Sequence, residues 1–210
     1  MRPGPLIRRL FGPFEHAVAE AYRGVFVDLD EVAALMRAWV PEARRILEVG
    51  CGEGAMTERI VRSYPAATVM AFDISPRVGR LYRGPASRVT FRQETAEGVA
   101  RREPASFDLV VLADVIHHVP PHARHSLLGA IKQSMAANGS LIFKDLVPSA
   151  TLLHCICALS DRYLTGDNVA YCTVDDINAL LTSSFGSGAI RKFEILRRQP
   201  NNVVVLVRAQ

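Results

Sequence analysis

The sequence offers little that would bind nucleic acid. Only three of its 25 lysines and arginines are lysines, and the arginines are spread along the chain. A nucleic-acid-binding surface normally gathers its basic residues into one patch or stripe. The net charge of +4 therefore reflects a preference for arginine in the composition, and the dispersed pattern argues against an RNA or DNA partner.

Features of secreted and membrane proteins are also scarce. The four cysteines have the spacing neither of a zinc site nor of a small disulfide framework (Cys51, Cys155, Cys157, Cys172). No apolar stretch precedes Arg8-Arg9, so we expect no signal peptide. The longest later apolar run, residues 152–159, is too short to span a bilayer. We expect a cytoplasmic protein with reduced thiols and no membrane span.

What is present suits one ordinary folded domain. The chain has 210 residues, of which 49% are hydrophobic and 22% charged, and it contains no repeats or low-complexity tracts. We expect a single domain over 1–210. It divides into an N-terminal helical cap, a ligand-binding core, a substrate-wall insert with the last helix, and a C-terminal hairpin (1–41, 42–146, 147–188, 189–210).

Apolar runs alternate with helical patterns along the core, which predicts a parallel sheet with right-handed crossovers. We expect strands at 46–49, 68–74, 89–93, 107–115 and 140–146. Between them we expect helices at 56–64, 97–102 and 121–136, and one that opens at Ser75-Pro76. Outside the core we expect helices at 14–22, 28–40, 150–163 and 173–185. The helix at 173–185 should begin with a capping box between Thr173 and Asp176.

The stretch from Ile46 to Gly54 organises the core. A buried strand stops at an acid, and glycines follow at positions 50, 52 and 54. Glycine permits a positive φ and leaves the backbone bare for a ligand. The segment Gly50-x-Gly52-x-x-Ala55 also satisfies the loose dinucleotide fingerprint. The ligand is therefore a nucleotide whose identity this spacing alone leaves open.

The acids of this stretch favour a cationic ligand. Glu48 and Glu53 would flank the pyrophosphate of a dinucleotide, and like charges at short range repel. S-adenosylmethionine instead brings an ammonium and a sulfonium. The pattern acid-x-Gly-x-Gly-x-Gly after an apolar strand resembles motif I of the class I S-adenosylmethionine-dependent methyltransferases. The resemblance implies donor binding by five residues of the turn (Glu48, Gly50, Cys51, Gly52, Gly54).

The end of the chain points to the same family. Residues 190–197 and 203–207 read as two strands joined by the tight connection 199–202, which predicts an antiparallel hairpin. A parallel sheet with an antiparallel strand at its end resembles the class I methyltransferase architecture. We therefore expect an α/β, Rossmann-like seven-stranded sheet, mostly parallel with an antiparallel C-terminal hairpin strand, and helices on both faces.

Further donor contacts follow the next strands. Asp73 ends the second strand, where a carboxylate accepts both ribose hydroxyls, and Ile74 comes directly after it. In the family, the loop after the third strand often reads Gly-Asp-Ala, whereas this chain has Thr95 at the Asp position and Ala96 behind it. Adenine would then be held by backbone at these two residues, or by Glu94 or Glu97.

The fourth strand carries the second strong resemblance to the family. Ala113 and Asp114 at its end should border the methionine part of the donor. His117 and His118 follow near the expected path of the acceptor, and either would suit a general base. The pair also occurs in relatives with different substrates, so packing and capping of the loop stays open as the alternative.

Two further observations bear on the chemistry near these histidines. Asp145, at the end of the fifth strand, is a second candidate base. His117, His118, His122 and His125 form a dense set, but no acid lies among them, so we expect no metal.

The acceptor wall should come from a few polar residues in an otherwise apolar lining (Tyr22, His118, Asp161, Tyr163, Tyr171). Such a lining suits a small, partly apolar acceptor.

The resemblance implies direct methyl transfer to an oxygen or nitrogen atom, with carbon less favoured. It also implies possible links to lipid or secondary metabolism, and a monomer or homodimer. Methylation of RNA or protein, and a non-catalytic partner subunit, stay open as alternatives. The absence of Asn-Pro-Pro-Tyr after the fourth strand removes one sign of enzymes that methylate amino groups of bases or glutamine.

Overall fold

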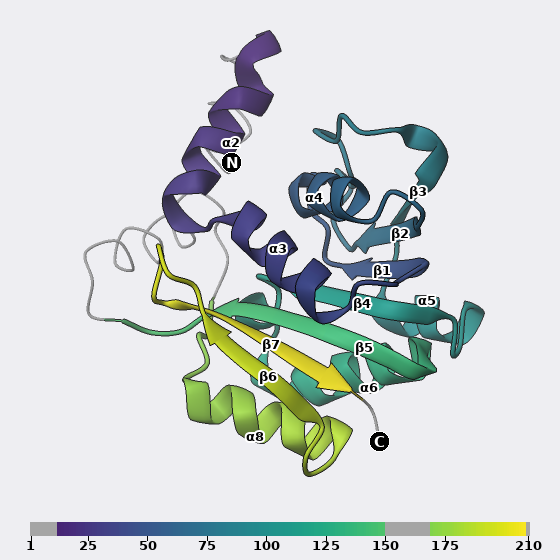
Figure 1. Ribbon diagram of the computed structural model, residues 1–210, viewed down its shortest axis with the longest axis vertical. Coiled ribbons are helices and arrows are strands. Elements are labelled where there is room, and N and C mark those ends of the chain that lie inside the picture. The colour runs from purple at the N-terminus through teal and green to yellow at the C-terminus, as the bar shows by residue number, and fades with distance from the viewer. Residues whose placement is uncertain (1–11, 150–168, 209–210) are drawn as a thin grey trace.

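A seven-stranded sheet forms the centre of the molecule (Figure 1). The computed structural model describes residues 12–149 and 169–208. The strand order is β3-β2-β1-β4-β5-β7-β6; β1 to β5 run parallel, and β7 is antiparallel to both of its neighbours. This confirms the expected fold class. The strands are β1 (Arg45–Val49), β2 (Thr68–Asp73), β3 (Val89–Gln93), β4 (Phe107–Ala113), β5 (Met135–Leu146), β6 (Ile190–Ile195) and β7 (Asn202–Arg208).

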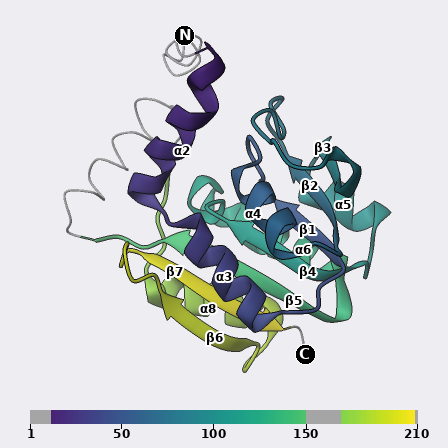
Figure 2. The same ribbon diagram turned by 45° about the horizontal axis from the view of Figure 1, so that its top comes forward.

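Helices cover both faces of this sheet (Figures 1 and 2). One apolar cluster lies between the sheet and α3 (Leu29–Trp39) with α4 (Ala55–Ser63), and the other lies between the sheet and α5 (Ala96–Arg102), α6 (Arg124–Ser134) and α8 (Val174–Phe185). Strands β4 and β7 are buried along nearly their whole length, as expected for strands covered on both sides. Four short 3₁₀ helices complete the described elements: η1 (Gly12–Phe14), η2 (Ala86–Arg88), η3 (Ile116–His118) and η4 (Pro121–Ala123).

The two helices before the glycine turn differ in how they pack. Helix α3 lies on the sheet through buried apolar residues that include Val32 and Met36. Helix α2 (Glu15–Phe26) instead extends away from the sheet, as Figure 1 shows. Ion pairs from its Glu15 and Glu20 to Arg80 and Arg59 attach it to the rest of the domain. The expected cap over an acceptor pocket stays a prediction.

The prediction that a helix begins at Ser75-Pro76 is wrong, because residues 74–81 form bends and turns. The backbone of this segment is engaged with the glycine turn. Gly79 N–H donates to the Gly52 carbonyl at 2.9 Å, and Leu81 N–H donates to the Glu53 carbonyl at 3.0 Å. Gly79 adopts a φ of +64°, and a Cβ there would lie 2.5 Å from the Phe91 ring. The segment therefore supports the turn instead of forming its own helix.

Several boundaries were also placed wrongly, among them the start of β5, which is Met135 and not Ser140, and the end of α2, which is Phe26 and not Tyr22. Helix α6 ends at Ser134 rather than at Ala136, because Met135 already pairs with Phe107 as the first residue of β5. Strand β4 ends at Ala113, since Asp114 takes a φ of +57° that breaks the extended backbone. The helix expected at 150–163 lies outside the described residues.

Helix α8 begins as the sequence predicts. Thr173 is its N-cap, and the expected capping box is present: Asp176 N–H donates to the Thr173 hydroxyl at 3.2 Å, and Thr173 N–H donates to the Asp176 carboxylate at 2.9 Å. The buried face of the helix then packs against the sheet through Ile177 and Leu181.

We predict that Thr173→Ala lowers the free energy of unfolding by about 1 kcal/mol, because the N-cap acceptor is lost. Urea denaturation followed by circular dichroism measures the change. Thr182→Ala is the matched control, since Thr182 is exposed within the same helix and alanine is a good helix former. An equal loss in both variants would contradict the capping role.

Candidate active site

The glycine turn lies between β1 and α4, at the carboxyl ends of the parallel strands, where open α/β sheets bind their ligands. Gly50, Gly52 and Gly54 have φ values of +69°, +51° and +97°. Each glycine is therefore needed for its backbone conformation. A Cβ added at Gly52 would meet no atom within 4 Å, so this backbone is open to a ligand.

Asp73, at the end of β2, holds the turn. One of its carboxylate oxygens accepts from Gly52 N–H at 2.8 Å, and the other accepts from Ser75 N–H at 2.8 Å. A carboxylate has about four lone-pair positions, so two remain for further donors such as ribose hydroxyls. Asp73, the residue predicted to bind the ribose, therefore lies directly beside the glycine turn.

Glu48 is the deeply buried acid of the site, with 2% of its surface exposed. Burial raises the pKa of its carboxyl group to about 8, the nearby Asp73 carboxylate adds to the rise, and the Thr57 hydroxyl opposes it. Its Oε2 has no hydrogen-bond partner among the described residues. Cys51 lies close by, and burial together with Glu48 and Asp73 raises the pKa of its thiol, which stays neutral. The turn therefore has a buried, largely neutral carboxyl group whose ionised form a bound cation would stabilise.

Glu53 contributes less to this environment than the sequence suggests. Its carboxylate forms an ion pair with Arg80 at 2.9 Å, and Arg80 also binds Glu15 of α2. The charge of Glu53 is therefore compensated outside the turn. The preference for a cationic ligand rests on Glu48 and Asp73 rather than on two flanking glutamates.

The predicted adenine contacts lie on the rim of the site. Ile74 follows Asp73 and is 75% exposed, so its side chain is free to cover a flat ring. Thr95 is the N-cap of α5, and its hydroxyl accepts from Gly98 N–H at 3.2 Å. The hydroxyl is thus used by the helix, as the preference of threonine for caps predicts. Glu94 forms an ion pair with Arg102.

The end of β4 places Asp114 beside a buried lysine. The Lys144 side chain is fully buried, and its ammonium forms an ion pair with the Asp114 carboxylate. The Asp114 N–H also donates to the Lys144 carbonyl at 3.0 Å. The sequence predicts Asp114 and Ala113 here but gives no role to Lys144. A charged residue within a strand that is otherwise apolar was the available signal.

His117 and Asp145 form a buried pair. His117 Nδ1 is hydrogen-bonded to Asp145 Oδ1, and the carboxylate also accepts from the backbone N–H groups of His117, at 3.2 Å, and Leu146, at 2.7 Å. Asp145 thus has three donors and is buried, which suits a group that orients His117 better than a free base. The His118 ring lies 4.2 Å from the His117 ring, between centroids.

The described residues do not bring the four histidines of this segment together as one set of metal ligands. Within residues 12–149 and 169–208, the groups whose ligand atoms lie within 4.8 Å of one another are Asp114, His117 and Asp145. Lys144 forms an ion pair with the first of them. His125 instead lies 3.3 Å from the Ser184 hydroxyl on α8.

Of the predicted acceptor-wall residues, Tyr171 and His118 both lie beside His117. The Tyr171 ring stacks on His117 with centroids 5.3 Å apart and planes inclined by 24°. Asp161 and Tyr163 lie outside the described residues. Tyr22 belongs to α2, and its side chain is also outside the described part.

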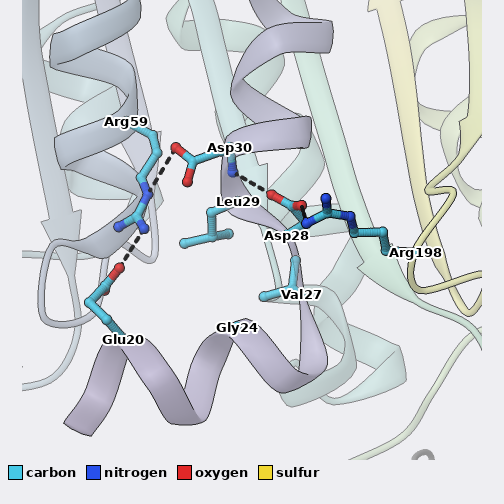
Figure 3. Close-up of a pocket in the computed structure, with 8 residues that line it drawn as sticks. All are labelled: Glu20, Gly24, Val27, Asp28, Leu29, Asp30, Arg59 and Arg198. Carbon is cyan, nitrogen blue, oxygen red and sulfur yellow. Dashed lines mark hydrogen bonds and ion pairs between the residues drawn. The ribbon is translucent and has the colours of Figure 1, made fainter. Parts of the chain in front are cut away.

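A separate hollow of about 220 Å³ lies between α2, α3, α4 and the connection before β7 (Figure 3). Its charged groups already bind one another: Arg59 contacts Glu20 and Asp30, and Arg198 contacts Asp28. Such mutually compensated charges offer little to a ligand, so we assign no role to this hollow.

Comparison with known proteins agrees with this geometry. Residues 46–139 match the family of methyltransferase domains. Over 124 residues the chain is 35% identical to a ubiquinone biosynthesis O-methyltransferase of Xanthomonas campestris, an alignment that covers 57% of this chain and 49% of the relative. The chain therefore spans about half the length of the curated relatives it matches.

Solved structures extend the likeness to nearly the whole chain. The 1,6-didemethyltoxoflavin-N1-methyltransferase of Burkholderia thailandensis, solved with S-adenosylhomocysteine, has a TM-score of 0.70 at 16% identity and covers 98% of this chain and 88% of its own. The structure of TnmH has a TM-score of 0.71 at 20% identity, with 98% and 60% covered.

Residues 46–139 thus form a methyltransferase domain. The fold is that of the class I S-adenosylmethionine-dependent methyltransferases. No helix in the described part of the chain is long and apolar enough to cross a membrane.

We predict that Glu48→Gln removes a pH dependence of stability. The carboxyl group has a pKa of about 8 when folded and an ordinary value of 4.5 when unfolded, so between these pH values the folded state binds more protons. Stability from this group is full below pH 4.5 and is lost as the pH rises to about 8, by a few kcal/mol. Urea titrations of both proteins at pH 4.5 and pH 8 measure it. An identical fall in wild type and variant would contradict the burial of an ionisable Glu48.

Proposed function

We propose that this protein transfers a methyl group from S-adenosylmethionine to an oxygen or nitrogen atom of a small, partly apolar acceptor. The observation that carries the proposal is the open glycine turn next to the unpartnered, buried carboxyl oxygen of Glu48. A cation placed there would restore the missing interaction and favour the ionised carboxylate. A dinucleotide pyrophosphate would disfavour the ionised carboxylate and so would gain no such interaction.

Different residues around the turn would bind different parts of the donor. Asp73 has two free lone-pair positions for the ribose hydroxyls, and Ile74 offers an exposed apolar side chain to adenine. Glu48 and Asp114 supply carboxylates for the donor ammonium, while the Gly52 backbone allows close approach. When bound, the donor supplies a methyl group on a sulfonium, which is already a good leaving group.

On the acceptor side, the chain has to align a nucleophile and take up its proton. Alignment and exclusion of water supply much of the rate of such a displacement. The rings of Tyr171 and His117, which are stacked, and the adjacent His118 ring form the proposed wall of the acceptor site. His117, oriented by Asp145, or the neighbouring His118 would receive the proton that an acceptor hydroxyl or amine loses.

The names of the relatives support a small acceptor. The Xanthomonas relative is named an O-methyltransferase, and the Burkholderia structure is named an N1-methyltransferase with bound 1,6-didemethyltoxoflavin. Oxygen is the better supported atom, because the sequence identity to the O-methyltransferase is higher. The apolar residues expected to line the insert agree with a partly apolar acceptor.

We predict that S-adenosylhomocysteine binds to the protein in calorimetric titration and that NAD does not. Asp73→Asn should weaken this binding by roughly 1–3 kcal/mol, because the charged hydrogen bonds to ribose are lost.

Asp108→Asn is the matched control for Asp73→Asn. The Asp108 carboxylate also accepts from two backbone N–H groups, those of Arg44 and Arg45 at 2.7 and 2.8 Å, but at the opposite end of the strands. This variant should bind S-adenosylhomocysteine like the wild type. Binding of NAD without S-adenosylhomocysteine would overturn the proposed donor.

We predict that His117→Ala and His118→Ala lower methyl transfer while the affinity for S-adenosylhomocysteine stays within about twofold. General-base assistance typically contributes a factor of about 10² to 10⁴. A labelled methyl donor, offered with pools of small hydroxylated and aminated aromatic compounds, identifies an accepted compound for the assay. Full activity in both variants would exclude the two histidines as bases. Donor binding without transfer to any pool would favour the non-catalytic alternative.

A further inference from the structure

Arg124 occupies a position that its own helix does not favour. It is the first residue of α6, and 9% of its surface is exposed. A positive charge at a helix N-terminus opposes the helix dipole, and the first turn of α6 contains no acid to compensate it. A reason for an arginine at this place has to come from outside the helix.

The guanidinium joins two loops. Its Nε donates to the Val119 carbonyl at 3.0 Å, after η3, while its two terminal nitrogens donate to the Ala170 carbonyl and to the Cys172 sulfur, the latter at 2.8 Å. Burial raises the pKa of the Cys172 thiol, although Arg124 opposes the rise, so the sulfur is a neutral acceptor. One planar side chain thereby binds three acceptors on both segments.

The segment held in this way carries Tyr171, between the two residues that Arg124 binds. Ala170 N–H also donates to the His117 carbonyl at 2.8 Å, and the Tyr171 ring lies on the His117 ring. His117 in turn is bonded to Asp145. A continuous set of contacts therefore runs from Arg124 through Tyr171 to the proposed catalytic histidine.

We infer that Arg124 is a positioning residue: by fastening residues 170–172 to the loop after η3, it seats Tyr171 on His117 and so sets the orientation of the His117–Asp145 pair. This inference rests on the proposed function, since it assigns His117 a place in the acceptor side of the site. It adds a residue that acts through Tyr171 and His117 and takes no part in the proton transfer itself.

The geometry of the side chain explains why arginine is required. A guanidinium presents five donors in a rigid plane, whereas a lysine ammonium is a compact charge on a flexible stem. Lysine at this position would keep the charge but would not reach Val119, Ala170 and Cys172 together. Arg124→Lys therefore separates the role of the planar set of hydrogen-bond donors from the role of the positive charge.

Nuclear magnetic resonance of histidine-labelled protein tests the inference without any turnover. The Cε1–H resonance of His117 is assigned by its absence from His117→Gln, and Tyr171→Leu defines the shift caused by loss of the stacked ring. We expect Arg124→Lys to move this resonance in the same direction by more than half of that shift. The double variant should add little to Tyr171→Leu, because both changes act through one contact.

Arg88→Lys is the matched control. Arg88 also donates to three backbone carbonyls, those of Val61, Tyr64 and Pro65, but at the end of α4. It should leave the His117 resonance unchanged. Should Arg124→Lys not fold, Cys172→Ala removes a single acceptor and should produce a smaller shift of the same sign.

A wild-type His117 resonance in a folded Arg124→Lys, or an equal shift in Arg88→Lys, would overturn the inference. Calorimetry with S-adenosylhomocysteine on the same samples keeps the two proposals apart. Unchanged affinity in Arg124→Lys is expected, because Arg124 lies on the acceptor side. Failure of the wild type to bind would refute the proposed function while leaving the resonance result to decide whether Arg124 orients His117.

Discussion

The site depends on the way β2 holds the glycine turn that follows β1. A turn with three glycines is costly to order, because glycine loses more backbone freedom on folding than any other residue. Here Gly50 and Cys51 N–H groups donate to the Phe72 carbonyl, and Gly52 N–H donates to the Asp73 carboxylate. The parallel pairing of β1 with β2 brings these partners to the same edge of the sheet. Donor binding is therefore prepared by the sheet itself.

The two sides of the site treat buried charge differently. On the donor side, Glu48 is buried without a cationic partner and is held largely neutral by its surroundings. On the acceptor side, Asp145 is paired with His117, and Asp114, at the border between the two sides, is paired with Lys144. The unpaired side is suited to receive a cation, whereas the paired side is already organised for orientation. This asymmetry agrees with a charged donor and an uncharged, partly apolar acceptor.

Local signals were sufficient for much of the fold and for the donor side. The glycine turn, Asp73 and the Thr173 capping box follow from short patterns, and the structure places them as predicted. The prediction of a helix after Ser75 was wrong, because the backbone N–H groups of Gly79 and Leu81 donate to the glycine turn. No local sequence pattern reveals these contacts. Arg124 was missed for the same reason, since two of its three partners, Ala170 and Cys172, lie far along the chain. Lys144 was given no role, because its ion pair with Asp114 depends on the end of the neighbouring strand.

The position of β7 has a consequence for how the chain folds during synthesis. This last strand lies between β5 and β6, and it covers the edge of β5 from Ser140 to Leu146. Until Asn202–Arg208 has been made, the parallel part of the sheet ends in an apolar strand with open hydrogen-bonding groups. Such an edge invites pairing with other chains, and a contact so distant in sequence forms slowly. The nascent protein is therefore most exposed to aggregation after β5 has emerged and before β7 has joined it.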